Sequence, residues 1–311
     1  MRLGKCVVVV GARRSVLAMT QARGVVVRLK KLFPQVKFII KGIVTRGDRL
    51  TGTIAQDAKG VFVKEIEEAL INRKIDLAVH SMKDLPIEIP KALTIAAVTK
   101  RSSPKDVLIS NRDSTINTLR PGARIGTSSP RRRVQLLSHR PDLKVMDIRG
   151  NLDTRIRKLK EGMYDAIIVA AAGMLRMGWQ QRVNQFIPMS VMLPAPGQGA
   201  LGIEIRKKDV LLRKIVKIVD HRITRIEVKA ERVFLKAMGG GCQKPIAAFG
   251  KLNADNLYLE AACADGQGRV VRGRVRGKSR RANELARQLA KRIKRELLFI
   301  RQKGELRHVQ I

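Results

Sequence analysis

The chain has 311 residues, and its 64 Lys and Arg against 26 Asp and Glu give a formal net charge of +38. A chain of this length buries a large core and commonly divides into two or three domains. Because 44% of the residues are hydrophobic, the composition excludes an intrinsically disordered protein. No apolar run approaches the roughly 20 residues that span a bilayer, and the run at 5–11 is too short for a secretory signal. We therefore expect a cytoplasmic protein without a membrane segment.

The three cysteines, Cys6, Cys242 and Cys263, are too few and too scattered for a disulfide framework or a metal site. The four histidines share no ligand spacing with them, so we predict no metal. Cys6 and Cys263 lie in apolar runs and are expected to be buried. Cys242 follows three glycines and precedes Gln243 and Lys244, which favours an accessible, partly activated sulfur. An inert thiol is the alternative.

A charge this positive indicates an anionic partner, and nucleic acid is one candidate. Aromatic residues make up only 3% of the chain, with one Trp and two Tyr, which argues against stacking on single strands. The excess is also uneven, since the segment from Arg269 to Arg307 contains fifteen Lys and Arg but three Glu. Nucleic acid is not the expected partner, but binding by this basic C-terminal region stays open.

The first half of the chain alternates short β-branched runs with helical patterns, which is typical of α/β domains with largely parallel sheets. In a first set, strands are expected at 7–10, 36–44, 75–80 and 93–98, with helices at 15–32 and 61–72. In a second set, strands are expected at 107–110, 124–127, 144–148 and 166–170, with helices at 131–139, 152–160 and 174–177. Two such sets predict two domains that face each other across a cleft.

The last third of the chain has a different pattern. A Pro/Gly-rich break at 193–199 precedes a strand expected at 200–205. A helix follows at 223–238, and three strand-like runs with antiparallel turn signals come after it. A basic helix from about 281 to 300 closes the segment. This pattern predicts a small third domain of the α+β class.

Three places combine the end of a strand with arginines at the start of the next helix. They are 11–15 with Ser15 as the cap, 126–133 with Ser129 as the cap and Pro130 in the first turn, and 149–155 with Asn151 as the cap. Helix N-termini attract anions, and arginine recognises carboxylate or phosphate with two hydrogen bonds. One such place would be an ordinary capped helix with solvated arginines. Three of them at strand ends predict a polyanionic ligand.

The segment HSMKDLP at 80–86 places an acid beside a base just beyond an apolar strand. In a cleft rich in arginine, Asp84 would stay ionised, because neighbouring cations favour its charged form. It could then handle protons or stabilise a cationic intermediate. The alternative is an ordinary surface pair of Lys83 and Asp84 at a turn. His80 is expected to be structural.

Seven segments, in order and correctly spaced, closely resemble the porphobilinogen deaminase (hydroxymethylbilane synthase) family, nearly from end to end. They are TRGD at 45–48, KGVFVKE at 59–65, HSMKDLP at 80–86, GTSSPRRR at 126–133, RGNLDTR at 149–155, APGQGALGIE at 195–204 and GGGCQKP at 239–245. The resemblance implies two periplasmic-binding-protein-like α/β domains around a cleft, plus a small C-terminal α+β domain. The implied boundaries are 1–99 with 200–217, then 100–199, then 218–311.

The resemblance also implies a monomeric transferase of tetrapyrrole (haem) biosynthesis. Cys242 matches the cysteine that carries one dipyrromethane cofactor through a thioether. Four porphobilinogen molecules are added to it head to tail, each with loss of ammonia, and hydrolysis then releases linear hydroxymethylbilane. Asp84 matches the catalytic aspartate, which would stabilise cationic azafulvene and pyrrolenine species through the pyrrole N–H groups. Each pyrrole carries an acetate and a propionate, so a full chain of six holds twelve carboxylates.

The same resemblance assigns further side chains to these ligands. Those implied to hold the cofactor, besides Cys242 and Asp84, are Lys83, Ser129, Arg131 and Arg132. Those implied to bind the substrate are Arg13, Ser15, Phe62, Thr127, Ser128, Arg149, Arg155 and Gln198.

Two places depart from the family pattern. The segment 51–58 is shorter than in many relatives and lacks their glycine-rich, lysine-bearing stretch, which leaves its behaviour as a lid open. Lys244 stands where relatives often have an apolar residue.

Two other classes of function compete with the enzyme. One is a non-catalytic anion-binding module with the same cleft, which the cysteine loop and Asp84 disfavour. The other is nucleic-acid binding by the basic C-terminal region.

Overall fold

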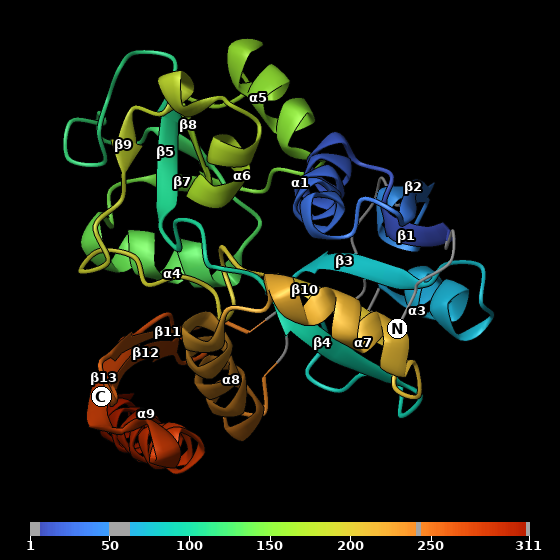
Figure 1. Cartoon of the computed structure of the whole chain (residues 1–311). Coiled ribbons are helices and arrows are strands. Elements are labelled where there is room, and N and C mark those ends of the chain that lie inside the picture. Colours follow the sequence, from blue (N-terminus) through green and yellow to red (C-terminus); the bar gives the residue numbers. More distant parts are fainter. Residues whose placement is uncertain (1–6, 50–62, 241–243, 309–311) are drawn as a thin grey trace.

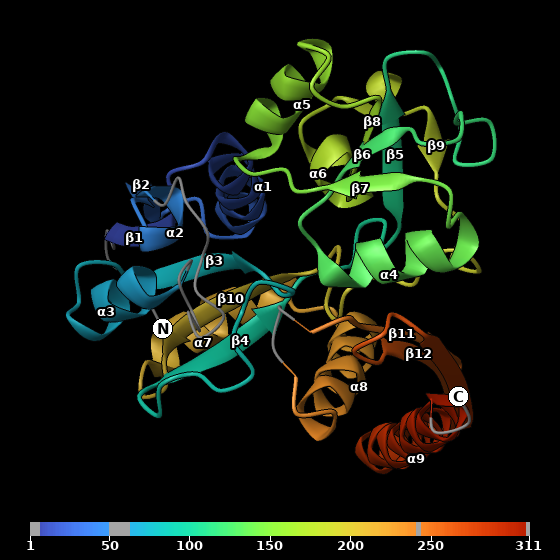
Figure 2. The same ribbon diagram turned by 180° about the vertical axis from the view of Figure 1, so that it is seen from behind.

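The structure, a computed structural model, describes residues 7–49, 63–240 and 244–308. Its elements form three units, each built around one sheet (Figure 1). Two α/β units lie next to each other, and a smaller α+β unit packs below them in this view and in the reverse view (Figure 2). The predicted fold class is confirmed. The domain boundaries stay a prediction, since the sheets show only which strands belong together. In the described part of the chain, no helix is long and apolar enough to cross a membrane.

The first unit has a five-stranded sheet in the order β2-β1-β3-β10-β4. Its elements are β1 (Val7–Arg13), α1 (Val16–Leu32), β2 (Lys37–Ile43), α2 (Arg46–Arg49), α3 (Lys64–Ile71), β3 (Leu77–Ser81), β4 (Leu93–Val98), β10 (Leu201–Arg206) and α7 (Val210–Val216). β1 pairs in parallel with β2 and β3, but β10 is antiparallel to both β3 and β4. The predicted strand at 200–205 therefore rejoins the first sheet, and it enters from the opposite direction because the chain returns from the second unit.

Helices cover both faces of this sheet, which explains its nearly continuous apolar strands. α1 and α7 pack on one face, where Leu29 and Ile215 belong to one buried cluster with side chains of β1 and β10. α3 covers the other face through Ile66 and Leu70. Leu77 and Ala78 of β3 face opposite sides and are both fully buried. The ends of β1 and β3 are thus held on a rigid layer.

The second unit repeats this plan with the strand order β7-β6-β8-β5-β9. Its elements are β5 (Asp106–Ser110), β6 (Arg124–Gly126), α4 (Pro130–His139), β7 (Lys144–Met146), α5 (Leu152–Lys160), β8 (Ala166–Ala170), α6 (Ala171–Arg176), a 3₁₀ turn (Gln180–Arg182) and β9 (Gln185–Phe186). β6 is parallel to β7 and β8, whereas β5 is antiparallel to β8. β5 corresponds to β10 of the first sheet, since each begins where the chain crosses between units. Both sheets are therefore mixed, although their central strands are parallel as predicted.

The third unit is an antiparallel sheet, β11-β12-β13, with two helices on one face. Its elements are α8 (Arg222–Ala237), β11 (Ile246–Asn253), β12 (Asn256–Ala264), β13 (Val270–Lys278), a 3₁₀ turn (Ser279–Arg281) and α9 (Ala282–His308), and a further 3₁₀ turn (Lys217–Val219) precedes it. A Cβ at Gly273 would lie 2.9 Å from Leu289. Glycine at this position therefore lets α9 pack directly on β13. α9 continues beyond the predicted helix end.

One buried ion pair ties the third unit to the crossing between the other two. Glu231 of α8 is fully buried and accepts a hydrogen bond of 2.7 Å from Arg101, which lies between β4 and β5. The same carboxylate accepts from the backbone N–H of Gly197, at 2.6 Å, and of Gly250, at 2.8 Å. Because both chain crossings and β11 meet this one side chain, it fixes how the three units sit together.

A second buried polar cluster lies inside the first unit. His80 of β3 and Glu204 of β10 are paired at 3.0 Å and are both buried, which confirms that His80 is structural. Glu67 of α3 is also buried, and one oxygen of Glu67 and one of Glu204 have no hydrogen-bond partner among the described residues. Burial, together with the charge of Glu204, raises the pKa of Glu67 to about 7. The folded state therefore favours a protonated Glu67.

This raised pKa predicts how stability changes with pH. Because the unfolded chain has the ordinary value near 4.5, the folded protein binds the proton more tightly, and its stability falls as pH rises from about 4.5 to about 7. Glu67→Gln should remove this dependence and raise the free energy of unfolding at pH 8 by roughly 1–3 kcal/mol. Urea unfolding at several pH values measures it. Glu68→Gln, on the exposed side of α3, is the control, and equal pH profiles for the two variants would contradict the prediction.

Candidate active site

A cleft of about 770 Å³ lies between the first and second units, where the parallel strands of both sheets end. This edge is where open α/β sheets bind ligands. Among the residues that the structure describes, the lining contains eight cationic side chains and one carboxylate, that of Asp84. The cations are Arg13, Lys83, Arg132, Arg149, Arg155, Arg157, Lys158 and Arg176. The cleft therefore suits a ligand with several negative charges.

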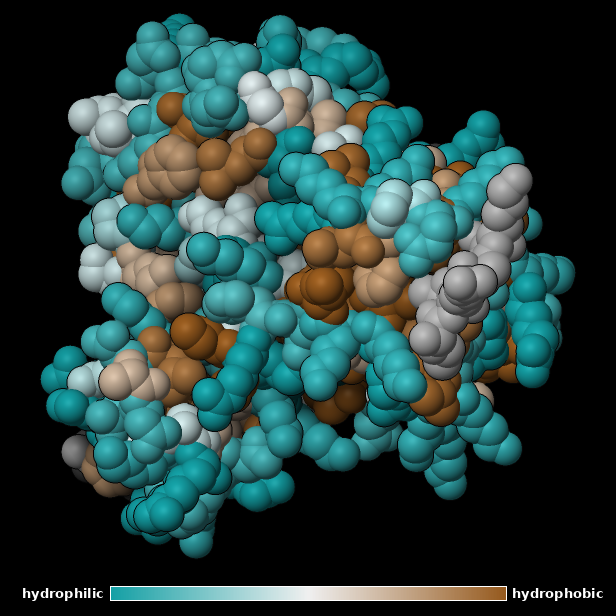
Figure 3. Space-filling model, viewed as in Figure 1, coloured by the Kyte–Doolittle hydropathy of each residue, from teal (hydrophilic) through white to brown (hydrophobic). Residues whose placement is uncertain are grey.

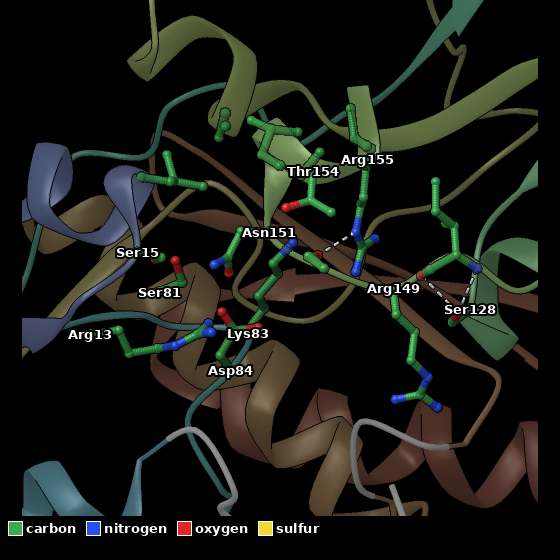
Figure 4. A pocket seen from close by; sticks show the side chains of 18 of the residues that line it. Arg13, Ser15, Ser81, Lys83, Asp84, Ser128, Arg149, Asn151, Thr154 and Arg155 are labelled. Atoms are coloured by element: carbon green, nitrogen blue, oxygen red, sulfur yellow. Dashed lines mark hydrogen bonds between the residues drawn. The ribbon is translucent and has the colours of Figure 1, made fainter. Parts of the chain in front are cut away.

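The three predicted strand–helix junctions all contribute to this cleft. Arg13 is the last residue of β1, and Ser15 is the N-cap of α1. Ser128 comes from the loop before α4, Arg149 from the loop before α5 and Arg155 from the first turn of α5. Arg13 lies on one side of the pocket, beside Lys83 and Asp84, and Arg149 and Arg155 lie on the other (Figure 4). Charged groups far apart in the sequence thus converge on one space.

The capping predicted for these helices is right at one place and wrong at two. The hydroxyl of Ser15 accepts a hydrogen bond of 3.4 Å from the N–H of Ala18. Ser129 and Asn151 occupy the N-cap positions of α4 and α5, but neither side chain accepts a capping bond. Near Ser129, it is the Thr127 hydroxyl that accepts from the backbone, taking the N–H of Ser129 at 3.2 Å. The first N–H groups of α4 and α5 therefore lack their predicted side-chain caps.

Arg131 and Arg132 are held by one buried acid that the sequence analysis did not single out. Asp106 is fully buried, and it accepts hydrogen bonds of 2.7 Å from Arg131 and 2.8 Å from Arg132. The amide of Gln198 also donates to it, at 3.0 Å. Burial opposes the ionisation of Asp106, but the two guanidinium groups outweigh it and hold its pKa well below the usual range. Arg132 reaches the cleft, whereas Arg131 also donates to the carbonyl of Leu193 and is not part of the lining.

Lys83 and Asp84 lie on the loop after β3 and line the cleft. The ammonium of Lys83 donates to the Gln198 side chain at 3.3 Å, and Asp84 is exposed to the cleft. Burial lowers the pKa of Lys83 to about 8, although Asp84 beside it acts in the opposite direction. These two side chains therefore belong to the pocket rather than to an outer surface turn.

The second unit supplies partly desolvated arginines. Burial, together with Arg132 and Arg149, lowers the pKa of Arg155 to about 10. The Arg155 Nε donates to the carbonyl of Gly150 at 2.8 Å. Burial likewise lowers the pKa of Arg176 to about 10, and this side chain donates to the carbonyl of Gly199 at 2.7 Å. Such groups gain most from an anionic ligand, because their charges are already withdrawn from water.

The third unit contacts the loop that carries Lys83 and Asp84. Arg232 of α8 donates to the carbonyls of Leu85, at 3.1 Å, and Pro86, at 2.6 Å, and more weakly to those of Met82 and Ile87. α8 ends at Ala237, just before the glycine-rich segment of Cys242. The start of that segment is thus fixed relative to the Asp84 loop.

The structure does not bring every predicted residue to the cleft. Thr127 is buried, and neither it, Ser129 nor Arg131 lines the pocket. Phe62, Cys6 and Cys242 lie outside the described residues, as does the whole of the segment 51–58. Cys263 is buried, and burial raises the pKa of its thiol to about 11. Within the described ranges, no three His, Cys, Asp or Glu side chains form a group that could hold a metal ion.

Several lining residues were missed by the sequence analysis. They include Gln21, Ser81, Thr154, Arg157, Lys158 and Arg176. Lys158 lies one turn after Arg155, so the helical period could have indicated it. Arg176 ends a short helix and has no motif around it. Only the packing of α6 against α1 directs it to the cleft.

Comparisons with known proteins show which family this chain belongs to. Residues 8–214 match the family model "Porphobilinogen deaminase, dipyrromethane cofactor binding domain", and residues 225–297 match the C-terminal domain of the same family. The chain is 48% identical over 273 residues to the porphobilinogen deaminase of Pelotomaculum thermopropionicum, covering 87% of this chain and 88% of that protein. It is 48% identical to that of Bacillus subtilis, covering 84% and 85%, and 45% identical to that of Thermus thermophilus, covering 87% and 90%. Among solved structures, the periplasmic VFT2 domain of BvgS from Bordetella pertussis aligns with a TM-score of 0.41 and 14% identity, over 73% and 92% of the two chains.

The family models together account for most of the described chain, and the relatives match it over nearly their whole length. The chain belongs to the porphobilinogen deaminase family.

Proposed function

We propose that this chain is a hydroxymethylbilane synthase, the transferase that joins four porphobilinogen molecules head to tail and releases linear hydroxymethylbilane. The observation that carries the proposal is the composition of the cleft, which has eight cations around one carboxylate. Each pyrrole of the substrate brings an acetate and a propionate, and a growing chain adds two carboxylates with every step. A cleft of this charge binds such a chain more strongly as it lengthens, which keeps intermediates bound until the last step.

Arginines from both α/β units would bind the carboxylates of the substrate. Arg149 and Arg155 of the second unit face Arg13 of the first across the pocket (Figure 4). Ser15, Ser128 and Gln198 add neutral polar groups to the same lining. A guanidinium pairs with a carboxylate through two parallel hydrogen bonds, so it fixes the orientation of the acid as well as its position. Contact with both units would hold the substrate pyrroles across the cleft.

The residues present fit the dipyrromethane cofactor of the family. Its two pyrroles carry four carboxylates, and Lys83 and Arg132 lie in the lining with further arginines around them. Ser129 and Arg131 would support this binding from α4, and Cys242 would form the thioether. When bound, the cofactor supplies the pyrrole carbon to which the first porphobilinogen is joined. Asp106 acts indirectly, since it holds Arg132 in place.

Asp84 is the one carboxylate in the described part of the lining, and we assign it the catalytic role. When porphobilinogen loses ammonia, the C–N bond breaks towards nitrogen, and the positive charge that remains is shared with the pyrrole N–H. An ionised carboxylate that accepts this N–H stabilises the cation as it forms. Formation of the new C–C bond then requires loss of a proton from the attacked pyrrole carbon, which a carboxylate in this position can accept. The surrounding cations keep the acid ionised for both tasks.

The intact mass of the protein tests the cofactor and its attachment together. Protein made in a host that supplies porphobilinogen should be heavier than its sequence by two linked pyrroles. Cys242→Ser should lose this increment, because only a sulfur nucleophile forms the thioether. Cys263→Ser, which alters the buried cysteine of β12, is the matched control and should keep the increment. A folded wild-type protein of unmodified mass would refute the proposal.

A second prediction concerns the acid. Asp84→Asn should keep the fold but lower the turnover of porphobilinogen by roughly 10²-fold or more, because the neutral amide no longer balances the developing charge. Asp153→Asn removes an exposed acid of α5 outside the lining and should leave turnover nearly unchanged. The measurement is the rate of ammonia release by modified protein. Equal rates for the two variants would exclude Asp84 from the mechanism.

A third prediction concerns the contact between α8 and the Asp84 loop. Arg232→Met should leave four carbonyl groups without their donor and destabilise the fold by roughly 1–3 kcal/mol. It should also lower the fraction of protein that carries the mass increment, because the start of the Cys242 segment is no longer fixed relative to the loop. Lys229→Met, at an exposed position of the same helix, is the control. Full modification of the Arg232 variant would show that this contact is not needed for assembly.

A further inference from the structure

The largest local excess of charge lies away from the cleft. The segment from Arg269 to Arg307, with its fifteen Lys and Arg and three Glu, forms β13 and α9. These elements lie at the opposite end of the molecule from α1 and α5, between which the cleft opens (Figures 1 and 2). The surface over α9 is mostly hydrophilic (Figure 3). Binding of pyrrole carboxylates in the cleft therefore does not account for this charge.

The sheet of the third unit has one face covered by helices and one that is not. α8 and α9 pack on the face formed by residues such as Leu257, Leu259 and Val271. Part of the other face is covered by the second unit, where Leu193 packs against Ala247 and Ala262. The remainder of that face exposes four cations and one aromatic ring, which we call the basic face, and it also contains the half-buried Glu260 of β12, directly opposite Arg274. Its members are Lys251, Tyr258, Arg274, Arg276 and Lys278.

The basic face is ordered by the register of the strands. β13 alternates arginine with valine or glycine, so Arg274, Arg276 and Lys278 all project from the same side, about 6.6 Å apart. Lys251, Tyr258 and Arg276 are directly opposite one another on the three strands. The result is a row of three cations along β13, which is crossed at Arg276 by a second row in which Tyr258 lies between Lys251 and Arg276.

Tyr258 and Arg276 form a stacked pair within this row. The guanidinium carbon of Arg276 lies 4.7 Å from the centre of the Tyr258 ring, and 38% of the tyrosine is exposed. Stacking fixes the plane of the guanidinium, and both groups are surfaces on which a nucleobase can stack. One of the two tyrosines of the chain is therefore placed where a stacking group would be useful.

Among the described residues, this face combines four exposed cations with one half-buried carboxylate, that of Glu260, so its positive charge is largely unbalanced. In the part of the chain that the structure describes, no carboxylate lies within salt-bridge distance of Lys251, Arg274 or Arg276. Lys278 has only a long contact of 3.8 Å with Asp255, between exposed groups. An edge strand such as β13 needs some charge to prevent pairing with other strands. Because β11 is the other edge strand of this sheet, the same requirement covers Lys251, but it does not explain the ring of Tyr258 stacked on Arg276 at the central strand.

We propose that the basic face binds single-stranded nucleic acid. The phosphates would follow the row of cations along β13, and a base would stack on the Arg276–Tyr258 pair, as is common on sheets that bind single strands. A duplex would present no free base to this pair. An anionic membrane would require exposed apolar side chains beside the charge, and the face has only the tyrosine. This binding is independent of the activity proposed above.

The test is the binding of a fluorescently labelled 20-nucleotide single strand, followed by anisotropy at several salt concentrations. The triple variant Arg274→Gln, Arg276→Gln and Lys278→Gln should lower affinity at least tenfold. The slope of log K against log salt should fall by about 2, since about 0.7 counterions are released per phosphate contact. Tyr258→Leu should weaken binding roughly fivefold or more, with little change in the slope.

A charge-matched control separates this face from the net charge of the whole protein. Arg23→Gln, Arg28→Gln and Lys31→Gln remove the same charge from exposed positions of α1 and should leave both affinity and slope nearly unchanged. Thermal unfolding confirms that each variant is folded. Turnover of porphobilinogen should be normal in the basic-face variants, because their residues lie outside the cleft.

Four results would overturn the proposal. One is equal loss in the two triple variants, which would show that binding follows net charge alone. Another is undetectable binding of the wild-type protein near physiological salt. A third is equal affinity for a blunt duplex with no effect of Tyr258→Leu. The last concerns vesicles that contain phosphatidylserine. If the triple basic-face variant loses vesicle binding but keeps its oligonucleotide binding, the face recognises a membrane and not nucleic acid.

Discussion

The buried carboxylate of Asp106 is the counter-charge on which the arrangement of the cleft depends. Eight cations around one space repel one another, and a guanidinium withdrawn from water without a partner is costly. Asp106 pairs with Arg131 and Arg132 and also accepts from Gln198, so it joins the start of β5 to α4 and to the second chain crossing. The strong lowering of its pKa shows how firmly the cations hold it ionised.

This pairing divides the arginines of the cleft into two groups. Arg131 is used almost entirely by the protein, since its partners are Asp106 and the carbonyl of Leu193. Arg149 and Arg155 have no such buried acid, and Arg155 keeps donors that face the pocket. Because these cations repel one another and are partly withdrawn from water, binding of a negatively charged ligand stabilises them. A polycarboxylate supplies it, which is why structure and ligand chemistry agree here.

The third unit completes the site through contacts with the backbone. Glu231 holds the two chain crossings through Arg101 and Gly197, and Arg232, the next residue, holds the loop of Asp84. Neighbouring side chains of one helix thus fix both the chain crossings between the α/β units and the loop that carries Asp84, the proposed catalytic acid. The position of α8 links the cofactor segment to both.

Much of this protein could be predicted from local patterns. Apolar strands followed by helices indicated the two α/β units, and the period of two in β13 places its arginines on one side. Glycine, serine and arginine at strand ends identified Arg13, Arg149 and Arg155, because the ends of parallel strands meet at one edge. The segments around Asp84 and Cys242 indicated the family without any three-dimensional information.

Other features arise only from contacts between residues distant in sequence. Asp106 reads as the first residue of an ordinary strand until α4 brings two arginines to it, and Arg176 has no motif at all. The distribution of the net charge of +38 also depends on the tertiary structure, because composition alone indicated a single anionic partner. Folding separates that charge, since strand ends direct one group of cations into a cleft while the pleat of β13 directs another onto an open sheet face. The sequence alone determines the net charge. Where the positive charges lie close enough to form a binding surface depends on which residues the tertiary structure brings together.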